Sequence, residues 1–116
     1  MNDKFSMVTL QELIDTVKLL NADAPRVSNG DTKVGLYIEI KDYDGQILSP
    51  GYNLAELLFN TLDANNLGTI SDCQDEIPII IQSFEFAGLK KFATLSDLPL
   101  VQLCHYMTNY DFEAIG

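Results

Sequence analysis

Apolar residues recur at helical spacing near the start of the chain. They are Leu10, Leu13, Ile14, Val17 and Leu20. Thr9 stands just before this stretch and Glu12 three residues later, which is the pattern of a capping box. The spacing predicts a helix over residues 10–20, and the polar residues that follow, as far as Pro25, are expected to end it.

Strict alternation of apolar and polar residues follows at residues 34–41 and predicts a β-strand. One face would hold Val34, Leu36, Ile38 and Ile40. The other would carry Tyr37, which we expect to be a packing residue, and then Glu39 and Lys41. The charged pair would lie at the C-terminal end of the strand, where parallel α/β proteins bind their ligands.

Two interpretations of this pair stay open. Dense branched side chains and nearby helices favour a parallel sheet buried on both faces, in which Glu39 would need a cation, either Lys41 or a metal. Alternatively, the two residues form a solvated pair on an exposed strand, which contributes almost nothing to stability. Residues 42–52 form a connection long enough to belong to a site.

A second helical stripe follows this connection. It consists of Leu54, Leu57, Leu58 and Leu62, and we interpret it as core. Asn53 followed by Glu56 repeats the N-cap pattern, and the helix is expected to stop near residues 65–68, where Gly68 suits a helix end.

Residues 79–84, which follow Pro78, form a β-branched run without strict alternation, typical of a strand buried on both faces. The later segments are, in order, a short helix (85–92), a turn (96–99), a third short strand (100–104) and a stretch without clear pattern (105–116). The alternation of helices and strands predicts an α/β fold with parallel strands and right-handed crossovers. Three strands leave free sheet edges, so we interpret the chain as a slice through a larger α/β barrel, truncated at both ends.

Composition narrows the classes of function. The chain has 116 residues, enough for one domain, and its 17 acidic and 7 basic residues give a formal net charge of −10. Such acidity disfavours binding to nucleic acids and to anionic membrane surfaces. No apolar run reaches the length of a membrane span. The N-terminus shows no signal peptide, although a truncated start would void that inference, so localisation stays unknown.

Cys73 and Cys104 lack metal-site spacing, and we assign the thiols no role, with a disulfide between them as an open alternative.

Several segments together resemble one enzyme family. The matching segments are Val34–Lys41 with its Glu-x-Lys element, Ile80–Glu85, Leu98–Leu103, the helix start Thr9–Glu12, and Tyr110–Gly116. In this order they are similar to segments of the glycerophosphodiester phosphodiesterases. The resemblance covers nearly the whole chain. It implies that residues 1–116 are a partial domain, from the middle to the C-terminal portion of a (β/α)8 TIM barrel.

The resemblance also implies roles for individual residues. Glu39 would be one of the carboxylates that hold a divalent cation, calcium or magnesium, and Lys41 would lie beside the substrate phosphate. The family's catalytic histidine pair has no counterpart here, because His105 lies too late in the chain, so we identify no catalytic residue. Gln82 is expected either to line the barrel or to pack, whereas Phe84 is expected to pack.

Where many members of the family have a proline after the Glu-x-Lys element, this chain has Asp42-Tyr43-Asp44. These carboxylates could add metal ligands, but we expect them to be solvated and do not count them as ligands. His105 is expected to have a structural or surface role.

The expected function is that of a fragment of a metal-dependent phosphodiesterase, which hydrolyses glycerophosphodiesters to glycerol 3-phosphate and an alcohol. This chain by itself is expected to be inactive, because attack on a phosphodiester needs a proton acceptor, a proton donor and a metal. The alternative is a non-catalytic acidic α/β interaction module whose open sheet needs a partner, including self-association through the sheet edges. A third alternative is an incomplete product that folds poorly and aggregates.

Overall fold

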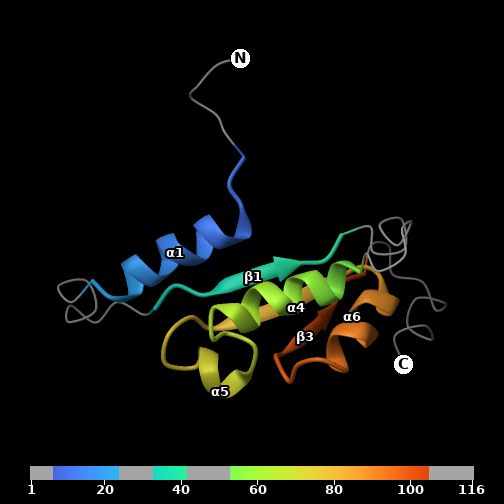
Figure 1. Cartoon of the computed structure of the whole chain (residues 1–116). Coiled ribbons are helices and arrows are strands. Elements are labelled where there is room, and N and C mark those ends of the chain that lie inside the picture. The colour runs from blue at the N-terminus through green and yellow to red at the C-terminus, as the bar shows by residue number, and fades with distance from the viewer. Residues whose placement is uncertain (1–6, 24–32, 42–52, 105–116) are drawn as a thin grey trace, which may run out of the picture.

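The computed structural model describes residues 7–23, 33–41 and 53–104. In chain order the elements are α1 (Leu10–Asn21), β1 (Leu36–Glu39), α4 (Leu54–Ala64), α5 (Ile70–Cys73), β2 (Ile79–Ser83), α6 (Phe86–Ala93) and β3 (Leu100–Gln102). The strands form a parallel three-stranded sheet in the order β1-β2-β3 (Figure 1). The predicted α/β class with parallel strands is therefore confirmed.

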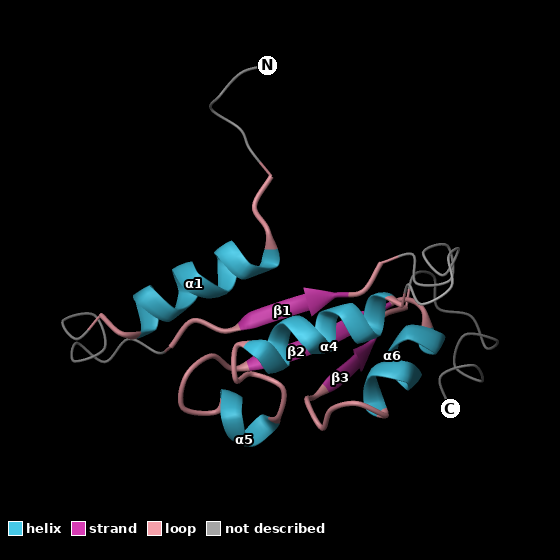
Figure 2. Ribbon diagram, viewed as in Figure 1, coloured by secondary structure: helices cyan, strands magenta, loops and turns pink. Residues whose placement is uncertain are grey.

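The helices gather on one side of the sheet. Figure 2 shows α4 in front of the strands, α6 beside β3 and α1 alongside β1. Ile14 and Val17 of α1 are buried in the same core as Leu58 and Leu62 of α4. Helices on one side are what right-handed crossovers produce when strands follow one another in sequence order.

The strand register defines two different faces. On the inner face Leu36 pairs with Ile79 and Ile38 with Ile81, and this face packs on the helices. The second face of the sheet, as we call it, carries Tyr37, Glu39, Ile80, Gln82 and Val101. Here Tyr37 is 54% exposed, and the other four are half-buried.

Three expectations about burial are therefore wrong. The sheet is not buried on both faces in the described part of the chain, because its helices pack on the inner face alone. Buried and half-buried residues alternate along β2, so this strand does not have two buried faces. Tyr37 and Phe84, both expected to pack, are 54% and 39% exposed.

Local signals position the two long helices. The Thr9 hydroxyl accepts the Glu12 N–H at 3.1 Å, and the Glu12 carboxylate accepts from Thr9, which completes the predicted capping box. The Asn53 side chain caps α4 in the same way, at 3.0 Å from the N–H of Glu56. These caps satisfy N–H groups that have no partner within the helix.

The end of α4 differs in detail from the prediction. The residue with the left-handed conformation after this helix is Asn66, with φ 59°, two residues before the glycine that was expected to mark the helix end. Gly68 lies at a closely packed position, since a Cβ there would be 3.0 Å from the carboxylate of the exposed Asp63, which would have to shift slightly. The short helix α5 was not predicted, although Thr69 caps it by accepting from the N–H of Asp72 at 3.2 Å.

A buried amide joins α1 to the amino end of the sheet. The Asn21 side chain donates to the carbonyls of Val34 at 2.9 Å and Glu76 at 2.8 Å, and it accepts from the N–H of Val34 at 2.8 Å. Asn21 thus connects α1 to the segments that lead into β1 and β2.

We expect Asn21→Ala to lower the free energy of unfolding by about 3 kcal/mol, because it leaves three backbone groups without this partner. Asn60→Ala, on an exposed position of α4, should change it by less than about 0.5 kcal/mol. Urea denaturation of both variants checks this. If both substitutions lowered the free energy of unfolding equally, the Asn21 hydrogen bonds would contribute no more to stability than the exposed side chain of Asn60.

Candidate functional site

Glu39 and Gln82, two of the residues predicted from the sequence, lie side by side on the second face. They are direct partners in the register of β1 and β2, each at or near the carboxyl end of its strand. The backbone holds the pair together, since the N–H of Ile40 donates to the carbonyl of Gln82 at 2.9 Å. Both side chains are half-buried.

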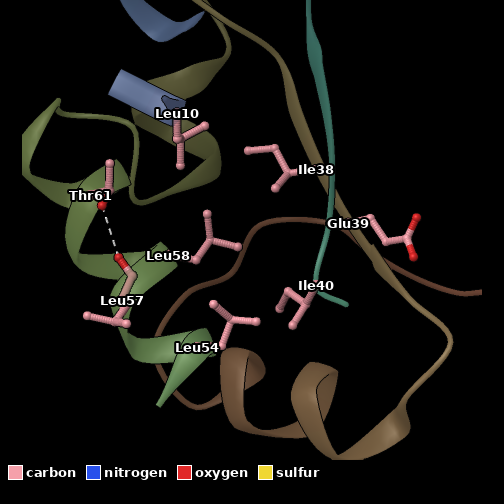
Figure 3. Close-up of a pocket in the computed structure, with 8 residues that line it drawn as sticks. All are labelled: Leu10, Ile38, Glu39, Ile40, Leu54, Leu57, Leu58 and Thr61. Atoms are coloured by element: carbon pink, nitrogen blue, oxygen red, sulfur yellow. Dashed lines mark hydrogen bonds between the residues drawn. The ribbon is translucent and has the colours of Figure 1, made fainter. Parts of the chain in front are cut away.

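An apolar cavity of about 230 Å³ lies on the opposite side of β1. It is lined by Leu10, Ile38, Ile40, Leu54, Leu57, Leu58 and Thr61, together with Glu39. Figure 3 shows the Glu39 carboxylate pointing away from this cavity, toward the second face. The cavity and the Glu39 carboxylate are thus on opposite sides of the strand.

Lys41 is exposed and forms no ion pair with Glu39. The salt bridges of the described residues are elsewhere, between Lys18 and Glu76 at 3.4 Å and between Lys91 and Glu56 at 3.1 Å. Glu39 is therefore not neutralised by the neighbouring ammonium, and its partial exposure leaves it solvated.

Ser83 and Gln102 are polar residues at this end of the sheet whose contacts were not foreseen from the sequence. Ser83 has no exposed surface, and its hydroxyl donates to the carbonyl of Ile40 at 2.7 Å. The Gln102 amide donates to the carbonyls of Phe84 and Leu103, each at 3.0 Å. The sequence signal that could have predicted such contacts was a serine at a buried position of an otherwise isoleucine-rich strand, because buried hydroxyls need hydrogen-bond partners.

The donor set for a cation is small in the described part of the chain. No three His, Cys, Asp or Glu side chains come together there. The second face offers the Glu39 carboxylate and the side-chain amide of Gln82, the residue paired with Glu39 on β2. Asp42, Asp44, His105 and residues 110–116 lie outside the described residues.

The two cysteines are free thiols, so the disulfide alternative is wrong. Cys73, the last residue of α5, is buried, and its thiol donates to the carbonyl of Leu67 at 3.2 Å. Burial, reinforced by the neighbouring carboxylates of Asp72, Glu76 and Asp97, raises the pKa of Cys73 to about 11. The thiol is therefore protonated at neutral pH and lacks nucleophilic character.

None of the helices in the described residues combines the length and hydrophobicity needed to cross a membrane.

Compared with known protein families, with curated proteins and with solved structures, the chain gives no significant match.

We expect iodoacetamide to modify Cys73 more slowly than the half-buried Cys104 at pH 7.5. Because the pKa of Cys73 is raised to about 11, its thiolate is a very small fraction at pH 7.5, and its rate should keep increasing with pH until about pH 11. Peptide mapping after timed alkylation measures both rates. Faster labelling of Cys73 at neutral pH would contradict the burial of this thiol.

Proposed function

We propose that this chain forms part of a metal-dependent phosphodiesterase, which in its complete form hydrolyses glycerophosphodiesters to glycerol 3-phosphate and an alcohol. The observation that carries the proposal is the position of Glu39 beside Gln82, at the carboxyl ends of adjacent parallel strands. Ligands of parallel α/β proteins bind at these ends. We infer the reaction from the resemblance of several sequence segments to glycerophosphodiester phosphodiesterases.

The strand order supports a barrel as the complete fold. Strands in sequence order with helices on one side are the repeating arrangement of a (β/α)8 barrel. One half of a doubly wound sheet has the same arrangement, but the whole sheet reverses its strand order and places helices on both faces. In a barrel, the second face with Glu39 and Gln82 would line the interior.

In this proposal Glu39 supplies one ligand to calcium or magnesium, and Gln82 lines the site with an amide oxygen beside it. Lys41 is exposed, two residues after Glu39 and just beyond the end of β1, and its ammonium would attract the substrate phosphate. Calcium takes about 6–8 oxygen ligands, so one carboxylate and one amide would bind it weakly. The remaining carboxylates and the acid–base histidines would come from sequence outside this chain, and the chain alone should not hydrolyse the diester.

We expect calcium with glycerol 3-phosphate to shift the amide NMR signals of residues 39–41 and 82, with a Kd of about 1 mM. Glu39→Gln should abolish these shifts, because it removes the anionic ligand. The control Asp75→Asn removes one exposed carboxylate near the amino end of β2 and should leave them unchanged. The proposed site would be contradicted if the ligand shifted the amide signals of all acidic residues. It would also be contradicted if Glu39→Gln and Asp75→Asn reduced the shifts equally.

A second candidate function is an interaction module, and the exposure of the second face favours it. Tyr37 is 54% exposed beside Ile80, and Val101 is half-buried on the same face. In addition, Leu36 and Ile40 direct their N–H groups to β2, so the alternate backbone groups of Tyr37 and Glu39 point toward the other edge of β1, where no strand of the described residues pairs. A partner that adds a strand or covers this face would bury these groups.

If the interaction module is correct, the chain should self-associate at micromolar concentration, and Tyr37→Lys should weaken that association by at least about tenfold. Leu19→Lys is the matched control, because Leu19 is 75% exposed on α1 and its replacement should have no effect. Sedimentation velocity across a concentration series measures this. A monomer at all concentrations would favour the phosphodiesterase fragment.

A further inference from the structure

We propose that Ser83 is a positioning residue, which aligns the end of β1 with the turn between β2 and α6 so that Glu39 and Gln82 face one ligand. This inference rests on the proposed function. It concerns a residue on the inner face, which touches no ligand itself and acts through the backbone.

The hydroxyl of Ser83 bridges two segments of the chain. It donates to the carbonyl of Ile40 at 2.7 Å and accepts from the N–H of Glu85 at 3.0 Å. Ile40 lies between Glu39 and Lys41, so the first bond fixes the backbone between the two predicted site residues of β1. Glu85 follows Gln82 by three residues, so the second bond fixes the chain where it leaves β2.

Ile40 is consequently held to β2 through both of its backbone groups. Its N–H donates to the carbonyl of Gln82 at 2.9 Å, and its carbonyl accepts from Ser83. From the other edge of the sheet, Gln102 of β3 bonds to the carbonyl of Phe84 at 3.0 Å. The carboxyl ends of all three strands are thus linked by side chains, at the end where the site residues lie.

Core packing alone does not explain a serine here. The preceding inner-face residues of β2 are Ile79 and Ile81, and Ser83 has no exposed surface. An apolar residue could fill the position, whereas a buried hydroxyl is costly unless it is fully bonded. Both hydroxyl bonds of Ser83 are directed at backbone next to the site, which is the arrangement expected of a residue that supports functional side chains.

Ser96 offers a control with the same chemistry. Its hydroxyl donates to the carbonyl of Gly68 at 2.6 Å and accepts from the N–H of Leu98 at 3.1 Å. It therefore also bridges a distant carbonyl and the N–H two residues further on, but it precedes β3 and lies at the amino end of the sheet. Ser83→Ala and Ser96→Ala remove equivalent bonds and differ in their distance from Glu39.

The experiment compares the full chain with both variants by amide NMR, first without ligand and then during titration with calcium and glycerol 3-phosphate. We expect Ser83→Ala to shift the amides of residues 39–41, 82 and 85 and to weaken binding about tenfold, as the loss of an aligning hydrogen bond implies. Ser96→Ala should leave those amides in place and change binding by less than about twofold.

The outcomes separate this inference from the proposed function. If the wild-type chain does not bind the ligand, the proposed function fails, and the ligand-free spectra alone then decide whether Ser83 positions the strand ends. If Ser83→Ala leaves residues 39–41 unshifted, or weakens binding no more than Ser96→Ala, Ser83 is a core residue and the inference is overturned. Should Ser83→Ala not fold, Ser83→Thr, which keeps the hydroxyl, must restore the wild-type signals of residues 39–41, and its failure to do so also overturns the inference.

Discussion

The described structure depends on the burial of the inner face of β2. Ile79, Ile81 and Ser83 are almost wholly excluded from water, and both other strands pair with this one. Removing apolar surface from water is the main favourable contribution to folding, and here it requires α4 and α6 to lie on the same side of the sheet. The positions of the strand ends, and so of Glu39 and Gln82, follow from this packing.

Hydrogen bonds of buried polar side chains then fix the relative positions of chain segments, which apolar packing alone does not define. At the amino end of the sheet, Asn21 joins α1 to the segments before β1 and β2. At the carboxyl end, Ser83 joins β1 to the β2–α6 turn. Apolar contacts are not directional, whereas these hydrogen bonds require defined distances and angles. The two residues therefore act at opposite ends of the same sheet in physically similar ways.

The two faces of the sheet have different consequences for function. Helices cover the inner face and form the hydrophobic core with it. The second face combines the exposed ring of Tyr37 with the half-buried side chains of Glu39 and Gln82. Both proposed functions use this face, either as the interior wall of a barrel or as a surface for a partner. They differ in what lies opposite it, a small phosphate ester or another polypeptide.

Local sequence patterns determined the elements of this protein. The capping box at Thr9, the cap at Asn53 and the alternation around Ile38 each depend on residues a few positions apart, so α1, α4, the strands and their parallel order were predictable, whereas the short helix α5 was missed. The direct pairing of Glu39 with Gln82 was not predicted, because it depends on the register of two strands that are far apart in the sequence.

Tertiary structure alone decided which face is covered and which polar groups are joined across the sheet. Ser83 and Ile40 are 43 residues apart in the chain, and Asn21 and Glu76 are 55 apart. No periodicity connects positions so distant. Burial of Tyr37 and Phe84 was wrongly predicted for the same physical reason, because the exposure of a side chain depends on what the rest of the chain places against it.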